Sequence, residues 1–198
     1  MSSIIEFDNL VNKLFNYTME QNPVYATYIG LHQFDEELPE GSRESYLNNL
    51  NTMKNFLYLF KTFPINELSK EKSLDHDLAI HGLQLELFEV ESLRFWESFP
   101  DCVNTVGDAL FPLITKNFAP FETRFHSILQ RIEKAPIFLE KSRSKIKNPI
   151  KLWLEIATES SKNLPNFLDT IISTARSNQI NTIKLEKAVK DLCDSLKD

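Results

Sequence analysis

Four histidines are the side chains of this 198-residue sequence that most readily suggest metal or acid–base chemistry: His32, His76, His81 and His126. A helical zinc motif places two histidines four residues apart, about 40° around the helix axis, so that both rings reach one ion. His76 and His81 are five residues apart, so their rings diverge by about 140°. Asp77 and His81 have the four-residue spacing, but the sequence offers no evident third ligand. We therefore predict no metal site here, only a surface aspartate beside a partly buried histidine.

Carboxylates and cysteines give no complete site either. Helical sites that hold two metals use Glu-x-x-His motifs, and the sequence has none, so a solvated face is predicted for Glu86, Glu89, Glu91 and Glu97. Cys102 and Cys193 are far apart and lack metal-type spacing, which predicts reduced thiols. No Gly-x-Ser-x-Gly elbow and no glycine-rich phosphate loop occur. The sequence thus predicts no catalytic residue, no metal ligand and no cofactor within this chain.

Charge and hydropathy bear on partners and location. The net charge is −6, from 22 basic and 28 acidic side chains. The one cationic run, residues 141–147, lies near a predicted helix end, where it complements the carbonyl end of the helix dipole. No stretch approaches the roughly 20 apolar residues that span a bilayer, and no leader pattern opens the chain. These features predict a cytoplasmic protein without a nucleic-acid or membrane partner.

The elements that must position these side chains are all predicted to be helices. Only 4 glycines stand against 15 phenylalanines, and no alternating strand pattern of useful length occurs. Periodicity and capping residues predict an all-α fold, an irregular array of about eight to ten helices. Breaks are predicted at Gly107 and Pro112, and prolines are predicted to open separate short helices at Pro120, Pro136 and Pro149. The other expected helices span residues 2–21, 23–29, 42–63, 69–99 and 181–198.

The segment 69–99 is predicted to be the longest helix, beginning at Ser69 or Ser73. Its inner face is expected to consist of Leu74, Leu78, His81, Leu85, Phe88 and Phe95. Three further apolar residues, Leu83, Leu87 and Val90, widen this stripe. Such a wide stripe is typical of a helix that is covered on more than one side.

The segment from Asn22 to Pro39 resists a purely structural interpretation. It reads Pro23-x-x-Ala-Thr-x-x-Gly30-x-His32, with Asp35 before a Leu-Pro pair. Gly30 suits the left-handed position that follows a helix. His32 and Asp35 then fall on a loop, where polar side chains often contact ligands.

This motif resembles the amino-terminal hallmark of a large prokaryotic family, "domain of unknown function 885". Looser matches follow in the family's order along nearly the whole chain: Asp77, Arg124, Arg131, residues 135–139, Arg143, Pro149, Trp153 and Ala157. The resemblance implies a long helical protein similar to zinc-dependent carboxypeptidases and oligopeptidases. In full-length members a zinc-binding His-Glu-x-x-His motif lies in the carboxyl-terminal half, and this sequence contains no such motif.

The resemblance implies that residues 1–198 form a single helical domain, the amino-terminal lobe of a longer chain. Such a lobe walls the substrate channel and is inactive alone, so zinc is implied only for full-length members. The implied partners are a carboxyl-terminal catalytic lobe and a peptide substrate. His32, Asp35 and Arg124 carry over only as family-motif positions without an assigned role. The last helix keeps its apolar stripe up to Asp198, which also suggests that the natural chain continues.

Two alternatives remain open at the level of sequence. One is a stand-alone helical binding or interaction module without catalytic activity. The other is a small independent enzyme that uses His32, Asp35 or the pair formed by Asp77 and His81.

Overall fold

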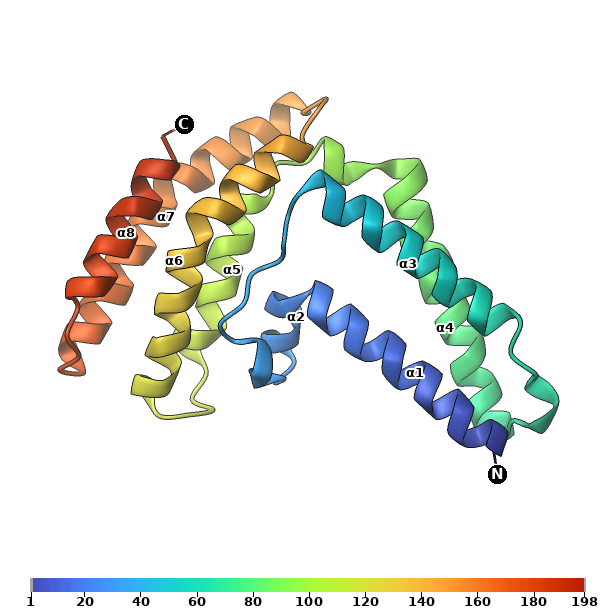
Figure 1. Ribbon diagram of the computed structural model, residues 1–198. Coiled ribbons are helices and arrows are strands. Elements are labelled where there is room, and N and C mark those ends of the chain that lie inside the picture. Colours follow the sequence, from blue (N-terminus) through green and yellow to red (C-terminus); the bar gives the residue numbers. More distant parts are fainter. Residues whose placement is uncertain (1, 198) are drawn as a thin grey trace. The chain divides into compact units, whose positions relative to one another are not determined.

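The structure, a computed structural model, describes residues 2–197 and the side chains from Ile4 onward (Figure 1). Over this range the chain forms eight α-helices and several short helical turns, and no residue is in a strand. The predicted all-α fold is therefore confirmed. Contacts group the chain into two compact units, which we describe one at a time. Unit 1 comprises the chain up to Gln21 together with Glu44–Phe95, and unit 2 comprises the remainder.

Unit 1 is built from three helices that share one apolar core. They are α1 (Ser2–Gln21), α3 (Arg43–Lys61, from Glu44 onward) and α4 (Lys70–Phe88). The core is formed by Phe7, Met53, Phe60, Leu83 and Leu87. The Ser69 hydroxyl begins α4 by accepting a hydrogen bond from the Lys72 amide at 3.3 Å, which satisfies a first-turn N–H group.

Helix α4 ends earlier than the sequence predicts. The expected helix runs to about residue 99, but α4 stops at Phe88 and is followed by a π-helical turn, Glu89–Leu93. Arg94 then adopts a left-handed conformation, with φ of 50°. Because a non-glycine residue in this region turns the chain out of a right-handed helix, α4 cannot continue.

The predicted inner face of α4 is wrong. The side chains expected in the core are exposed to solvent: Leu74 by 58%, Leu78 by 69%, Leu85 by 60%, Phe88 by 51% and Phe95 by 50%. The face that packs into the core of unit 1 is the opposite one, with Leu83 and Leu87. Helix α4 carries apolar residues on two opposite faces, and hydrophobic periodicity alone does not tell which of them is covered.

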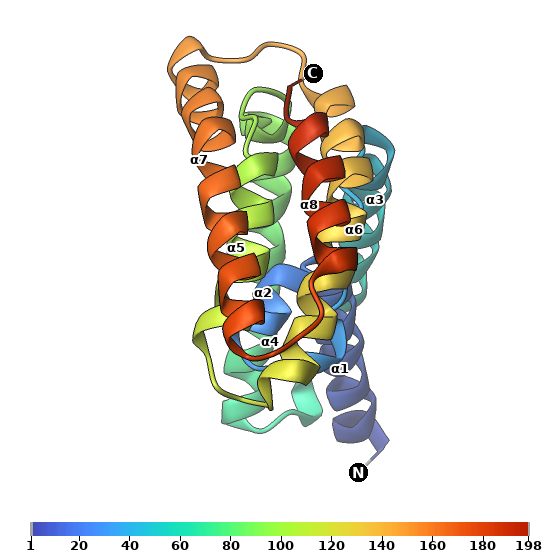
Figure 2. The same cartoon turned by 90° about the vertical axis from the view of Figure 1, so that its left-hand side faces the viewer.

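Unit 2 contains the longest helices and the larger core (Figure 2). Helix α5 (Cys102–Thr115) packs on α6 (Phe121–Lys145), and α8 (Ile183–Ser195) packs on the same α6. Helix α7 (Lys151–Ser177) contacts both α5 and α8, and the short α2 (Pro23–Tyr28) lies against α5. Fully buried apolar side chains fill the space between these helices: Leu110, Leu113, Ile128, Ile132, Leu139, Leu168, Ile171, Leu185 and Leu192.

Three prolines lie inside these helices instead of ending them. Pro112 is within α5, as is Gly107, Pro136 is within α6 and Pro165 within α7, so the predicted breaks at Gly107, Pro112 and Pro136 are wrong. An interior proline costs about 3 kcal/mol, because it removes a hydrogen bond and crowds the preceding turn. Fully burying a Leu, Ile or Phe side chain stabilises by about 1.5–3 kcal/mol. The α6 residues Ile132 and Leu139, on both sides of Pro136, are buried in the core and outweigh that cost.

Candidate functional site

His32 and Asp35 lie next to each other, as two members of a hydrogen-bonded cluster that follows α2. Gly30 has φ of 94°, the left-handed conformation expected for it, and the chain then forms a short 3₁₀ turn, His32–Phe34. The buried Asp35 carboxylate accepts a hydrogen bond from Thr27 Oγ1 at 2.8 Å, and His32 Nδ1 lies 3.0 Å from its other oxygen. The motif therefore brings together a histidine, a carboxylate and a hydroxyl.

Beneath this cluster lies Arg131 of α6, whose side chain is only 1% exposed. Its Nη2 donates to Thr27 Oγ1 at 2.7 Å, which links the guanidinium through Thr27 to Asp35. The same side chain donates to four backbone carbonyls, those of Pro23, Phe34, Glu37 and Ala109. A guanidinium has five N–H groups in a rigid fork, and here it joins α2, the following loop and α5 to α6.

Burial changes the ionisation of Arg131. Desolvation lowers the pKa of its guanidinium to about 10, and the nearby Asp35 and Glu37 act in the opposite direction. The side chain stays charged at neutral pH, so the carboxylate of Asp35 is its compensating negative charge. A buried cation needs such compensation, because an unpaired charge in the interior is strongly unfavourable.

His32 is the accessible member of the cluster. Its side chain is 37% exposed, and its ring stacks on Phe118 with centroids 3.6 Å apart and planes inclined by 14°. A histidine oriented by a carboxylate is the arrangement of a general base. The hydroxyl of Thr27 does not serve as its nucleophile, because it is buried, donates to Asp35 and accepts from Arg131.

Arg124 takes a different position, at the carboxyl end of α5. Its Nη1 donates to the carbonyls of Leu113 at 2.7 Å and Ile114 at 3.2 Å, and its Nε donates to that of Ala119 at 3.0 Å. Its Nη2 donates to Asn117 Oδ1 at 3.0 Å. The last carbonyls of a helix have no partner within the helix, so Arg124 satisfies groups that would otherwise be unpaired. The contacts of Arg124 are those of a helix cap.

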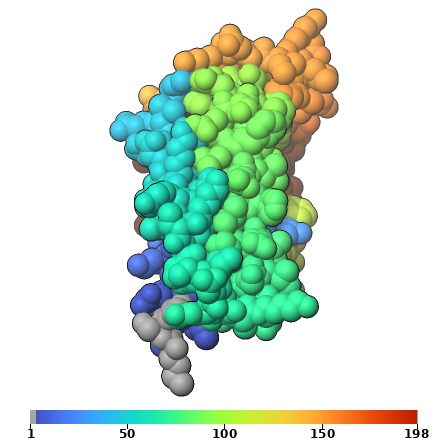
Figure 3. Space-filling model, turned by 90° about the vertical axis from the view of Figure 1, so that its right-hand side faces the viewer, coloured from blue at the N-terminus to red at the C-terminus, as the bar shows by residue number. Residues whose placement is uncertain are grey.

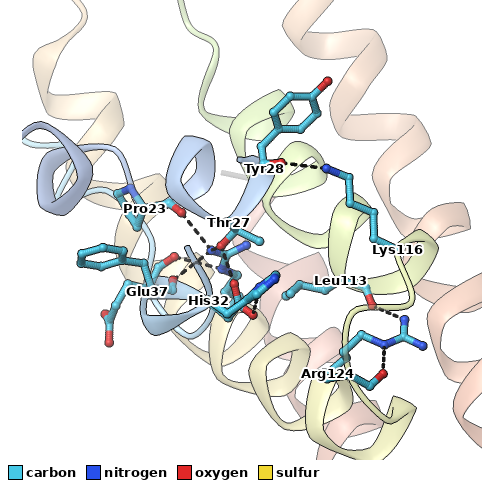
Figure 4. Close-up of polar contacts among 12 residues, drawn as sticks. Pro23, Thr27, Tyr28, His32, Glu37, Leu113, Lys116 and Arg124 are labelled. Carbon is cyan, nitrogen blue, oxygen red and sulfur yellow. Dashed lines mark hydrogen bonds and ion pairs between the residues drawn. The ribbon is translucent and has the colours of Figure 1, made fainter. Parts of the chain in front are cut away.

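Two lysines contact the same region, and Figure 4 shows the first of them, Lys116. Lys116 Nζ donates to the Tyr28 carbonyl at 2.7 Å and lies 4.2 Å from the centre of the Tyr28 ring. Lys134 Nζ donates to the Glu36 carbonyl at 2.9 Å and pairs with Glu37 at 2.8 Å. The segment that carries His32 and Asp35 is thus held to the rest of unit 2 at several points along its length.

The histidines of α4 do not form a site. His76 is buried and its Nε2 lies 2.8 Å from the Phe60 carbonyl, whereas His81 is exposed and Asp77 is 68% exposed. The buried histidine is therefore His76, and the prediction of a partly buried His81 is wrong. Across residues 2–197, no group of three or more His, Cys, Asp or Glu side chains is arranged to hold a metal ion.

The solvated face predicted for the glutamates is wrong for Glu97. This carboxylate is buried, pairs with Arg43 and lies 3.8 Å from Lys147 Nζ. Burial, followed by repulsion from Glu89, raises the pKa of Glu86.

Both cysteines are free thiols, as predicted. Burial is the main cause that raises the pKa of Cys102 and of Cys193, which reduces the reactive thiolate fraction.

Two hollows in the surface of unit 2 lie away from the motif residues. One, of about 300 Å³, lies between α6 and α8 and is lined by Ile132, Glu133, Pro136, Lys184, Lys187, Ala188 and Asp191. The other, of about 500 Å³, lies between α5 and α7 and is lined by Val103, Asn104, Gly107, Asp108, Ser160, Asn163, Leu164 and Phe167. None of His32, Asp35 and Arg124 lines either hollow.

Arg131, around which the cluster is built, has no role that the sequence motif indicates. A signal was present, because Arg124 and Arg131 occupy the inner face of α6 among Phe125, Ile128 and Ile132. A long cationic side chain at a core position must find acceptors there. That rule identifies both arginines as polar centres of the fold, although it does not name their acceptors.

The fold and the site define an all-helical protein whose buried polar side chains join helices and loops. The chain belongs to the family described as "Bacterial protein of unknown function (DUF885)", whose model matches residues 23–197, and the predicted resemblance is thereby confirmed. A solved structure from Shewanella oneidensis, described as a candidate lipoprotein of unknown function, superposes with a TM-score of 0.84 at 19% identity. The match covers 96% of this chain and 36% of that one. No curated protein matches the chain. None of the helices described here is long and apolar enough to cross a membrane.

Proposed function

We propose that this chain is the amino-terminal helical lobe of a zinc-dependent metallopeptidase-like protein, in which it walls the channel for a peptide substrate. In this proposal a carboxyl-terminal lobe binds zinc through a His-Glu-x-x-His motif, and the present chain is inactive alone. The observation that carries the proposal is the family match over residues 23–197, because the family resemblance implies a zinc peptidase. This sequence contains no His-Glu-x-x-His motif.

The lengths of the matched chains support the proposal that this chain is one lobe of a longer protein. This chain spans about a third of the solved Shewanella oneidensis protein, while nearly all of this chain takes part in the match. Such unequal coverage is expected when a single lobe is compared with a longer protein of similar fold.

The motif residues have a role in the proposal that needs no chemistry of their own. Arg131 is bonded to α2, to α5 and to the loop after α2, and Arg124 closes the end of α5. A channel wall must keep its shape while a substrate moves past it, and buried charge-assisted hydrogen bonds supply such rigidity. His32 and Asp35 then hold the loop instead of attacking a peptide bond.

The proposal is tested by incubating the chain with equimolar zinc and a mixture of unblocked peptides, and by following products by mass spectrometry. Product formation is expected to equal that of a zinc-only blank, both for the chain and for His32→Ala. Hydrolysis well above the blank that is lost in His32→Ala contradicts the proposal. That result would indicate that His32 and Asp35 catalyse the hydrolysis, and it would favour the alternative of a small independent enzyme.

A stand-alone helical binding module is a second candidate function. One observation favours it: each of the two units has an apolar core of its own, so neither needs a further lobe to bury its central side chains. The native mass of the protein separates the two candidates, because the lobe belongs to a larger chain and the module does not. For either candidate we propose a cytoplasmic location, which cell fractionation with an antibody tests.

A further inference from the structure

The outward face of α4 carries a stripe of exposed apolar side chains with one histidine in it. Leu74, Leu78, Leu85 and Phe88 are each more than half exposed. With His81, which is also exposed, they follow one another at alternating spacings of four and three residues. This is the spacing of the seam along which one helix packs against another. In Figure 3 the surfaces of α3 and α4 (cyan to green), both in unit 1, face the viewer.

Beyond the first turn of α4, which contains Lys70 and Lys72, the charged side chains beside this stripe are acidic. From Ser73 to Leu93 the sequence contains five carboxylates and no lysine or arginine. On a helical projection of α4, Asp75 lies along one side of the stripe and Asp77 along the other, and Glu89 follows directly after Phe88 at the end of the helix. Glu91 has a lysine partner from α3, Lys54. The face therefore combines exposed leucines with a negative border.

Gly82 provides a second observation at the same place. It lies in the middle of α4, is exposed, and a Cβ atom added to it would meet nothing within 4 Å. A glycine inside a helix costs about 0.5–1 kcal/mol relative to alanine, and no contact in the described part of the chain explains it. Because Gly82 borders the stripe, its missing side chain lets another backbone approach α4 closely.

We infer that the outward face of α4 is a docking site for a protein helix whose own apolar stripe is edged by lysine and arginine. Leucines of the partner pack between Leu74, Leu78 and Leu85, and its cations meet the carboxylates along both sides. The inference rests on the α4 face and does not depend on the proposed function.

The charges decide between this occupant and two others. A second copy of α4, packed parallel or antiparallel, brings carboxylates against carboxylates, which is unfavourable along a helix seam. A membrane surface containing anionic lipid repels the same border, and helices that lie on such surfaces carry basic polar faces. Only a partner with the opposite border gains both apolar burial and charge complementarity.

Two synthetic helical peptides of 21 residues test the inference, each with a leucine seam, one edged by lysines and the other by glutamates. Binding to the whole chain is followed by the anisotropy of a fluorescent label at 150 mM salt. The lysine-edged peptide is expected to bind at least tenfold more tightly than the glutamate-edged one. The double replacement Leu78→Gln and Leu85→Gln is expected to weaken its binding at least tenfold, and Leu152→Gln to leave it unchanged. Leu152 is the matched control, because it is a 60% exposed leucine on α7.

Further measurements distinguish the proposed partner from the alternatives and from loss of folding. Circular dichroism verifies that the exposed replacements leave the helices intact. Equal binding of both peptides, or binding that survives the double replacement, overturns the inference. Sedimentation that shows a dimer lost in the double variant overturns it in favour of a second copy. Binding of the chain to vesicles of phosphatidylglycerol, lost in the same variant, overturns it in favour of a lipid surface.

Discussion

At the scale of single residues, Arg131 is the side chain on which the motif region depends most. Its guanidinium is buried, and it supplies donors to Thr27 and to four carbonyls. Removing one partner of a buried charged group leaves the others unpaired, and the cost is then larger than the net value of the interaction.

We expect Arg131→Met to lower the free energy of unfolding by about 3–5 kcal/mol, because Thr27 and the four carbonyls lose their donor in the interior and Asp35 loses its compensating positive charge. Urea unfolding followed by circular dichroism measures the change. The matched control is Arg176→Met, which removes an arginine that is 62% exposed and paired with Glu186. Its expected cost is below about 1 kcal/mol. Equal costs for the two variants contradict a central role for Arg131.

Glu40 links stability to pH. Partial burial raises its pKa, but hydrogen bonds from Lys141 and Ser42 outweigh this and lower the pKa from 4.5 to about 2. The native state therefore binds this proton more weakly than the unfolded state. The contribution of Glu40 is present above pH 4.5 and is lost as the pH falls toward 2.

We expect Glu40→Gln to be less stable than wild type at pH 4.5 and above, and this difference to shrink as the pH falls to 2. The effect stays below about 1 kcal/mol, because both side chains of the pair are 45% exposed and screened by solvent. Unfolding by urea across this pH range measures it. Lys141→Met is expected to remove the same pH-dependent component. A pH dependence of Glu40→Gln identical to that of wild type contradicts the account.

Residue types and spacings could predict part of this site. Gly30 was predicted to be left-handed, and His32 and Asp35 were predicted to lie on a loop, because local backbone rules decide both. The contacts of Arg131 with Pro23, Phe34 and Glu37 join parts of the chain about 100 residues apart. No local rule contains that information, so the role of Arg131 was visible only in the fold.

At the scale of elements, the sequence predicts the helix boundaries that local signals decide, and misses those that tertiary packing decides. α1 and α2 end close to the predicted residues because Gln21 is followed by Asn22-Pro23 and α2 by Gly30. Pro136 was predicted to open a helix, yet α6 runs through it, because apolar residues on both sides are buried in the same core. Tertiary packing thus overrides a local helix breaker.

Two glycines give a paired prediction at this scale. Gly41 has φ of 80°, and a Cβ atom there would lie 2.6 Å from Ser142 Oγ and 2.8 Å from the Phe138 ring. Gly82 is helical, with open space around it. We expect Gly41→Ala to cost more than about 1 kcal/mol and Gly82→Ala to gain about 0.5–1 kcal/mol. Urea unfolding of both variants measures the difference, and effects of the same sign would be at odds with these conformations.

At the scale of the whole molecule, the chain divides into two units with separate cores, and one helix exposes a second apolar face. The sequence predicted the all-α class and the family, because composition and a specific motif decide them. The sequence pattern predicted that the exposed face of α4 belongs to the core of this chain. Apolar spacing indicates that a helix face can be covered, but it does not indicate what covers it.

We propose that this chain is a lobe of a larger protein, and the native mass of that protein tests the proposal most directly. An antibody raised against unit 2 is applied to a denatured extract of the source cells, beside the purified chain of 23.0 kDa. Because the chain corresponds to 36% of a protein of similar fold, the native band is expected at more than twice that mass. A single native band at 23.0 kDa, unchanged when proteolysis is blocked, would contradict the account and leave the stand-alone module in its place.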